Sequence, residues 1–255
     1  LGALSLFYPV EVLDNLNENY TKSAIHIATK KNYYETVRYL VQNLHIDLNV
    51  RTFDEANIAP IHIAAMTSSL ETFKEIIKLG GNPLIEDAFG NNAFYYAFAY
   101  GSDFMVSQMM NIQSFIFELS SPSILIPIVQ NKQASSSFQL ICHLIDPSAT
   151  RKCDERGMTL LSIATQYDNR KIVNDLLLMG VDPSIPANNG KNSIHICAEN
   201  NRIGCSTLIL KYLLLTKGID EINKILNYPD KNGNLPIHIA ASKGYSGFVA
   251  HLLSV

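Results

Sequence analysis

A short motif recurs along the chain at intervals near 33 residues, and this period constrains the fold more than any other feature of the sequence. The motif has an apolar residue, histidine, isoleucine and a small residue at its core. Clear copies stand at 23–28, 59–64, 193–198 and 235–240, and weaker copies at 92–97, 124–129 and 159–164 continue the rhythm. With the histidine position as the anchor, the seven anchors are His26, His62, Tyr95, Pro127, Ser162, His195 and His238. They are separated by 36, 33, 32, 35, 33 and 43 residues. A fixed period of about 20–50 residues is the signature of stacked repeats, in which each unit buries its apolar face against the next.

Apolar residues eleven, fourteen and fifteen positions after the anchors form a second pattern. Because spacings of three and four place residues on one face of an α-helix, this pattern predicts a second helix in each unit. In the sixth unit the stripe is displaced to about Ile209, Tyr212 and Leu213, which indicates either extra residues in the turn between the helices or a lengthened second helix. The triplets of the other six units are Val37/Leu40/Val41, Phe73/Ile76/Ile77, Val106/Met109/Met110, Phe138/Ile141/Cys142, Val173/Leu176/Leu177 and Val249/Leu252/Leu253.

Turn-forming residues stand at two fixed places in the units. One place is the sixth position after the anchor, between the paired helices. It holds Asn32, Ser68, Gly101, Asp168, Asn201 and Gly244. Ahead of the anchors, aspartates eight residues back and glycines five residues back predict a tight turn before the first helix. The aspartates are Asp54, Asp87, Asp154 and Asp230, and the glycines are Gly90, Gly157, Gly190 and Gly233.

This combination resembles the ankyrin-repeat family, whose unit carries a Thr-Pro-Leu-His-x-Ala motif. The segment 230–241 is close to the family consensus, and 180–183 resembles its Gly-Ala-Asp ending. The resemblance implies an all-α ankyrin-repeat solenoid of stacked helix-turn-helix units with hairpin-like turns over residues 19–255. Residues 1–18 would form an N-terminal capping helix or a helix of a preceding repeat. The expected units are near 19–50, 51–83, 84–116, 117–150, 151–183, 184–226 and 227–255. In the fourth unit Pro127 replaces the histidine, which predicts a distorted or shortened first helix.

Composition argues against several function classes. The 20 Lys+Arg and 23 Asp+Glu of the 255 residues give a net charge of −3, so binding to a phosphate backbone is not expected. Four cysteines are too few for a disulfide scaffold, and their spacing contains no CxxC pair, which favours a reducing cytosol. The longest apolar runs, 124–129 and 208–215, are far shorter than the roughly 18 residues of a membrane span, so no direct membrane insertion is expected.

The residues that could suggest catalysis have structural explanations. The recurring histidines lie about 33 residues apart in a linear stack and cannot converge on one metal ion. The resemblance implies instead that they hydrogen-bond the backbone at the hairpins. Cys197 occupies the small-residue position of its unit, and Cys142 is expected on a buried stripe, away from the neighbouring His143. We therefore expect no enzyme activity, no cofactor and no metal site in these residues.

The resemblance places partner contacts at the turn tips, seven, six and four residues before the anchor, and on the first helix, four and five residues after it. The candidate partner-binding residues at these positions are Tyr20, Lys30, Lys31, Ile58, Met66, Phe89, Tyr100, Arg156, Met158, Tyr167, Lys191, Lys231 and Lys243. Gln166, Asn189, Glu199 and Asn200 also occupy such positions. The apolar and aromatic members suggest an anchoring strip flanked by basic ends, because such residues are enriched in interface cores. The alternative is that irregular units turn some of them inward.

The sequence therefore predicts a non-catalytic protein–protein interaction module that binds a partner protein, of unknown identity, on its concave face. The alternative hypothesis is a targeting or regulatory ankyrin domain of a larger enzyme, effector or channel. The chain ends within an apolar helix stripe and begins with Leu, so we expect a longer polypeptide. Frequent Asn, Ile and Lys resemble coding from an AT-rich genome, as in intracellular pathogens. The expected location is cytoplasmic, in the host cytosol if the protein is a secreted effector.

Overall fold

The computed structural model describes residues 23–112, 121–151 and 154–255, and within these ranges the chain is helical, without a β-strand. The all-α prediction is therefore confirmed. The helix expected over residues 1–18 and the candidate residue Tyr20 lie outside the described residues. The chain divides into two compact halves, Leu1–Phe115 and Ile116–Val255, and each half is considered by itself.

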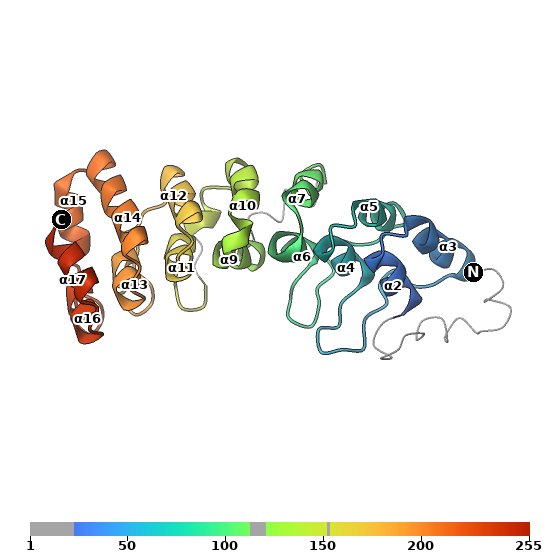
Figure 1. The fold of residues 1–255 in the computed structure, drawn as a ribbon, viewed down its shortest axis with the longest axis horizontal. Coiled ribbons are helices and arrows are strands. Elements are labelled where there is room, and N and C mark those ends of the chain that lie inside the picture. The colour runs from blue at the N-terminus through green and yellow to red at the C-terminus, as the bar shows by residue number, and fades with distance from the viewer. Residues whose placement is uncertain (1–22, 113–120, 152–153) are drawn as a thin grey trace. The chain divides into compact units, whose positions relative to one another are not determined.

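The first half contains three helix pairs (Figure 1). The first helices of the pairs, called inner helices, are α2 (Ala24–Lys30), α4 (Pro60–Met66) and α6 (Ala93–Tyr100). The second or outer helices are α3 (Tyr34–Leu44), α5 (Leu70–Lys78) and α7 (Asp103–Met109). Each outer helix packs on the inner helix of its own pair, and α4 contacts both α2 and α6.

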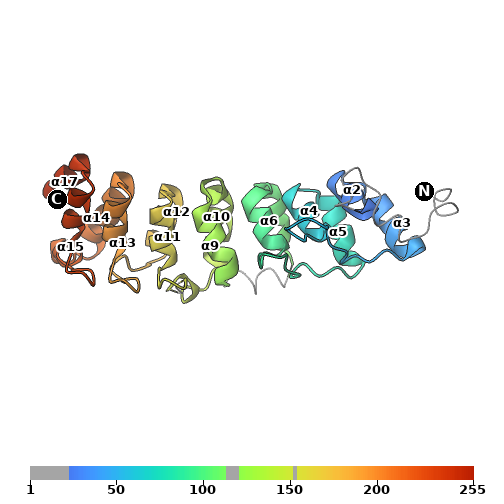
Figure 2. The ribbon, with the colours of Figure 1, turned by 90° about the horizontal axis from the view of Figure 1, so that it is seen from below.

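The described residues of the second half repeat this arrangement with four pairs and one additional helix (Figure 1 and Figure 2). Its inner helices are α9 (Pro122–Gln130), α11 (Leu160–Gln166), α13 (Ser193–Glu199) and α16 (Pro236–Ser242). Its outer helices are α10 (Ser135–Ile141), α12 (Arg170–Leu178), α14 (Ile203–Thr216) and α17 (Ser246–Leu253). The inner helices contact one another in chain order, and the additional helix α15 (Ile219–Leu226) packs on α14.

The outer helices share one register. Every outer helix begins eight residues after its anchor, whether the anchor is His26, Pro127 or His238. The predicted second helices are therefore confirmed, and residues eleven and fourteen positions after the anchor are buried in all but the last repeat, where Val249 is half-buried. The fifteenth position is less buried than expected, since Val41 and Ile77 remain half-exposed. The buried stripe is rotated toward the tenth position, where Thr72, Met105 and Ile172 are buried, among others.

The stripe predicted for the sixth repeat is only partly correct, because Ile209 and Leu213 are buried but the ordinary register is kept as well. Its tenth, eleventh, fourteenth and fifteenth positions are Cys205, Ser206, Ile209 and Leu210, and all four are buried in the ordinary register. The turn before α14 keeps its usual length, and Tyr212 is only half-buried. The extra residues lengthen α14 to 14 residues and then form α15, so the lengthened-helix alternative holds and the insertion follows the outer helix.

Of the two alternatives predicted for the first helix of the fourth repeat, distorted or shortened, the shortened helix is wrong. Helix α9 has nine residues with Pro127 inside it, against seven or eight in the other inner helices. The irregularity lies in the outer helix instead. Helix α10 is a seven-residue segment between two 3₁₀ turns, Lys132–Ala134 and Cys142–Leu144.

Hairpin loops precede several of the inner helices, and in the described residues three of the predicted aspartates, Asp87, Asp154 and Asp230, close them. In the third repeat, Oδ1 of Asp87 accepts hydrogen bonds from the backbone N–H groups of Phe89 and Asn91, both at 2.8 Å. Asp154 and Asp230 accept the equivalent pairs of bonds in their own loops. Gly90 follows with a φ of 78°, a left-handed conformation that glycine adopts without strain.

Backbone hydrogen bonds also join successive hairpins. The N–H of Ala88 donates to the carbonyl of Ala56 at 3.1 Å in the first half. In the second half, Asn188 donates to Arg156 at 2.9 Å and Lys231 donates to Asn189 at 3.0 Å. In all three bonds the donor stands seven residues before its anchor, directly after the position of the turn aspartate. The hairpins joined by these bonds therefore follow one another in the same register.

The anchor histidines His62 and His195 each connect their own repeat to the next. Nε2 of His62 lies 2.6 Å from the carbonyl oxygen of Ile85, and Nε2 of His195 lies 3.1 Å from that of Asn234. A carbonyl oxygen can only accept, so Nε2 carries the proton, and Nδ1 accepts a backbone N–H at the start of its own helix. Burial lowers the pKa of both histidines, although the hydrogen bonds to the carbonyls act in the opposite direction. The ring is therefore neutral, and it joins two repeats.

Replacing the turn aspartate should destabilise the hairpin. We expect Asp87→Ala to lower the free energy of unfolding by about 2–4 kcal/mol, because the N–H groups of Phe89 and Asn91 and the hydroxyl of Tyr96 lose their acceptor. Asp87→Asn keeps one carbonyl oxygen and should lose about half as much. Urea unfolding followed by circular dichroism measures both values. Equal losses in the two variants would contradict this role.

The neutral histidines should make the protein sensitive to mild acid. The unfolded chain takes up the proton near pH 6.5, whereas the folded chain resists it, so the stability present at about pH 7.5 should fall as the pH drops below about 6.5. The variant His62→Gln/His195→Gln should be less stable at neutral pH but lose less stability between about pH 7.5 and pH 5.5. Urea midpoints at the two pH values test this, and an unchanged pH dependence in the variant would exclude these two histidines as its cause.

Candidate protein-binding surface

The inner face, defined here as the surface of the hairpin loops and inner helices within each half, holds the described candidate residues. In the first half, Lys30 and Lys31 are exposed at the end of α2. Phe89, in the third hairpin, is 69% exposed, and Tyr100, the last residue of α6, is 62% exposed. Met66 is half-buried at the end of α4.

Ile58 does not face solvent as predicted, since it is only 8% exposed. Its N–H donates to the hydroxyl of Thr52 at 2.9 Å, and its carbonyl accepts from the N–H of Thr52 and lies 3.2 Å from Nε2 of His26. Met158, at the same position of the fifth repeat, is 5% exposed, and both its N–H and its carbonyl bond to Asp154. The position four residues before the anchor therefore belongs to the closing side of the hairpin and is directed inward.

An aromatic cluster supports the exposed ring of Tyr100. The ring of Tyr96 stacks on that of Tyr100 with centroids 6.2 Å apart and also makes an edge contact with Tyr95 at 5.3 Å. Tyr96 is itself fixed, because its hydroxyl donates to Oδ2 of Asp87 at 2.6 Å. Burial and this hydrogen bond raise the pKa of Tyr96 far above its usual range, so it remains a donor. We call Tyr95, Tyr96 and Tyr100 the aromatic platform. The carboxylate of Asp87 links this platform to the hairpin of Phe89, because it accepts hydrogen bonds from the hydroxyl of Tyr96 and from the N–H of Phe89.

A pocket of about 320 Å³ opens on the inner face of the second half. It is lined by Arg156, Met158, Gln166, Ala187, Asn189, Ile196, Glu199, Asn200 and Lys243, which come from three successive repeats. Three of the predicted candidates, Arg156, Met158 and Lys243, thus come together, and Met158 contributes to the lining although it is buried. Sequence reasoning missed Ala187 and Ile196, because neither stands at a position where the family makes contacts.

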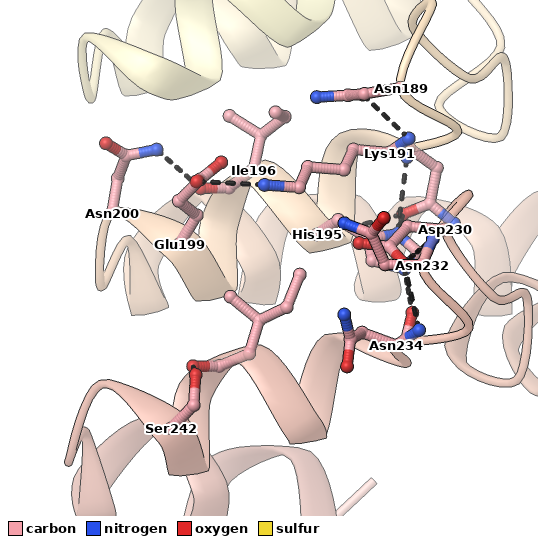
Figure 3. A network of polar contacts seen from close by, with 12 residues as sticks. Asn189, Lys191, His195, Ile196, Glu199, Asn200, Asp230, Asn232, Asn234 and Ser242 are labelled. Carbon is pink, nitrogen blue, oxygen red and sulfur yellow. Dashed lines mark hydrogen bonds and ion pairs between the residues drawn. The ribbon is translucent and has the colours of Figure 1, made fainter.

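Lys191 reaches this pocket through an ion pair. Its Nζ lies 2.9 Å from Oε1 of Glu199, while its N–H donates to Oδ1 of Asn189 at 3.1 Å (Figure 3). The lysine side chain is 17% exposed and that of Glu199 is 33% exposed, so both charges are partly withdrawn from water. The remaining candidates of this half, Tyr167 and Lys231, are exposed outside the pocket lining.

The residues that raised the question of catalysis were also located in the described part of the chain. Cys142 is only half-buried, so the prediction that it lies on a buried stripe is wrong; its Sγ donates to the carbonyl of Gln139 at 3.3 Å, and partial burial raises the pKa of this thiol. Within the described ranges, no group of three metal-binding side chains was found. Among the helices that the structure describes, none is long and apolar enough to cross a membrane.

Comparison with known proteins identifies the class. The ankyrin-repeat sequence model matches residues 22–53, and a model of three ankyrin repeats matches 161–255. The helix pairs and hairpins described above also match solved ankyrin-repeat domains. The chain belongs to the ankyrin-repeat family, and ankyrin repeats form protein–protein interaction modules.

Among curated proteins, the p105 subunit of nuclear factor NF-kappa-B from Gallus gallus is 26% identical over 69% of this chain and 19% of its own length. An ankyrin repeat protein of Acanthamoeba polyphaga mimivirus is 21% identical over 84% of this chain and 22% of its own length. The chain therefore spans about a fifth of the length of these relatives.

Solved structures show the same fold. The human ASB11 ankyrin repeat domain has a TM-score of 0.68 at 16% identity and covers 91% of this chain and 97% of its own. The ankyrin repeat domain of Bcl-3 has a TM-score of 0.69 at 16% identity, with 92% and 99% covered. A third match, from a complex of a predatory endopeptidase of Bdellovibrio bacteriovorus with an immunity protein, has a TM-score of 0.60 at 20% identity, with 75% and 98% covered.

The ion pair beside the pocket can be tested by a double-mutant cycle. We expect Lys191→Met and Glu199→Gln each to reduce the free energy of unfolding, and the pair to show a coupling energy of about 0.5–2 kcal/mol because both charges are partly shielded from water. Chemical unfolding of the two single variants and the double variant supplies the cycle. A coupling energy indistinguishable from zero would show that the pair does not stabilise the pocket wall.

Proposed function

We propose that this chain is a non-catalytic protein-binding module that engages a partner protein through its inner face, which is the concave face of the predicted array. The observation that carries the proposal is the exposure of Phe89 and Tyr100, two large aromatic side chains on the inner face of the first half. Aromatic side chains with fixed supports are typical of the few residues that dominate binding energy in protein interfaces.

The core of the third repeat does not require these two rings. Within α6, Phe94, Tyr96 and Phe98 are buried and fill the space between the helices. Phe89 and Tyr100 expose most of their surface to water, which is unfavourable by roughly 25 cal/mol per Å² of apolar surface. A partner that covers both rings would recover this free energy, and the aromatic platform holds Tyr100 in place at little entropic cost.

The anchoring strip is smaller than the sequence predicted. Ile58 and Met158 are buried and leave it, and Met66 is half-buried. Phe89 and Tyr100 in the first half, and Tyr167 in the second, remain as exposed aromatic contacts. Lys30, Lys31, Lys231 and Lys243 are exposed cations of the kind that steer a partner and fix its orientation.

We also propose that the protein acts in the cytosol, which is a reducing compartment. Cys197 and Cys205 are buried free thiols. Burial raises the pKa of Cys197 and, with Asp168 nearby, raises that of Cys205 to about 12. Both residues serve as small packing groups that stay protonated, a role that suits a cytosolic protein.

The test is a quantitative pull-down from eukaryotic lysate with the whole chain and with Phe89→Ala/Tyr100→Ala. We expect a retained partner to bind at least about tenfold more weakly to the variant, because two interface aromatics are lost. The variant should stay folded, with a change of at most about 1.5 kcal/mol in stability, since the rings are exposed.

A matched control removes two aromatic rings elsewhere in the same half. Phe104, on outer helix α7, is 62% exposed, and Tyr33, before outer helix α3, is 59% exposed. Phe104→Ala/Tyr33→Ala should retain the partner. A partner lost equally from both variants, or from neither, would contradict binding through the inner face and would favour the alternative of a docking surface for a larger polypeptide.

A further inference from the structure

The pocket of the second half has a charge pattern that suggests what it binds. Its apolar lining is buried: Met158, Ala187 and Ile196 are each less than 9% exposed. Charged and amide side chains form the rest of the lining. A volume of about 320 Å³ is larger than one side chain, so the pocket has room for a side chain together with part of the segment that carries it.

Three carboxylates in and beside this pocket are already bound within the protein, whereas Glu155, next to Arg156 in the chain, is exposed and has no ion pair among the described residues. Glu199 pairs with Lys191. Asp154 pairs with Arg156 at 2.9 Å and accepts backbone N–H groups of its hairpin, and Asp230 accepts the N–H groups of Asn232 and Asn234. These negative charges are therefore neutralised or hydrogen-bonded.

Two cations are left over. Lys243, at the C-terminal cap of α16, lines the pocket and forms no ion pair with any described residue. Lys231, in the hairpin that donates to Asn189, is exposed and likewise has no ion pair in the described ranges. Asn189 uses its Oδ1 for the N–H of Lys191, which leaves its amide N–H₂ as a donor in the lining.

We propose that this pocket receives the carboxylate of an aspartate or glutamate on an extended segment of the partner protein. Lys243 supplies the charge, the amide of Asn189 donates a hydrogen bond, and Met158 and Ile196 contact the methylene groups of the incoming side chain. A carboxylate suits this set because it accepts several hydrogen bonds and balances an unpaired cation. The inference rests on the proposed function and specifies the chemistry that the partner presents.

The experiment is selection of a displayed random dodecapeptide library on the whole chain, on Lys243→Glu and on Lys211→Glu. Lys211 is an exposed residue of outer helix α14 in the same half, so its variant has the same net charge without altering the pocket. Individual selected peptides are then measured by fluorescence anisotropy.

We expect peptides selected on the whole chain to share one Asp or Glu. Their affinity should fall at least about tenfold on Lys243→Glu and no more than about twofold on Lys211→Glu, since reversal at the pocket puts like charges together. Replacement of the shared acid by Asn or Gln should produce the same loss on the whole chain.

Three results would overturn the inference: selected peptides without a shared acid, acidic peptides that bind Lys243→Glu as well as the whole chain, or no selected peptide on any of the three proteins. The proposed function is tested separately, by the lysate pull-down with the Phe89→Ala/Tyr100→Ala variant. A lysate partner that depends on Phe89 and Tyr100 but is indifferent to Lys243→Glu would leave that function standing and remove only the acidic pocket.

Discussion

The fold depends on a neutral imidazole that bonds to two neighbouring repeats at once. Nδ1 of His62 accepts the N–H of Ala59 at the start of its own inner helix, while Nε2 donates to the carbonyl of Ile85 before the next hairpin. His195 repeats this arrangement between the sixth and seventh repeats. Both ring nitrogens are used and both rings are fully buried, so the spacing between helix and hairpin is fixed at these two junctions. The hairpin-to-hairpin bonds then continue the same register, because the loops they join already stand at the correct separation.

The sequence predicted the repeating part of this structure well, since the relevant signals are local. The turn residues six positions after the anchor illustrate this: Asn32 and Asp168 have φ values of 58° and 56°. Gly101 departs from them with an extended backbone, and there a side chain would meet the carbonyl oxygen of Ala97 at 2.4 Å. Gly244, at the same position of the last repeat, has a φ of 73°, so glycine stands at this position for two different physical reasons. Such a distinction depends on three-dimensional proximity, which the periodic pattern does not contain.

The errors concern places where one pattern is compatible with two structures. A ten-residue insertion after His195 could precede or follow the outer helix, and the apolar run near Leu213 suggested a shifted stripe. The burial of Cys205 and Ser206 shows that small side chains kept the register there, although a search for large apolar residues does not detect them. Ile58 and Met158, at the candidate site, also show that the sequence pattern alone does not decide between two structures. They occupy a position that the resemblance assigns to contacts, yet their hairpin backbone bonds hold them on the closing side.

The turn aspartates have a second consequence for the surface. Asp87, Asp154 and Asp230 direct their carboxylates at backbone N–H groups, and the pKa of Asp230 shows the balance: burial acts to raise it, but the hydrogen bonds from Asn234 and Asn232 lower it overall, so the carboxylate stays ionised and hydrogen-bonded. The hairpins thus use carboxylates for structure and leave lysines such as Lys231 and Lys243 without an ion pair among the described residues. In a chain whose net charge is negative, the lining of this pocket therefore carries two cations, Arg156 and Lys243, and one carboxylate, Glu199. Because the turn carboxylates are already hydrogen-bonded within the hairpins, the groups that remain available to a ligand here follow from the hairpin geometry rather than from the overall composition.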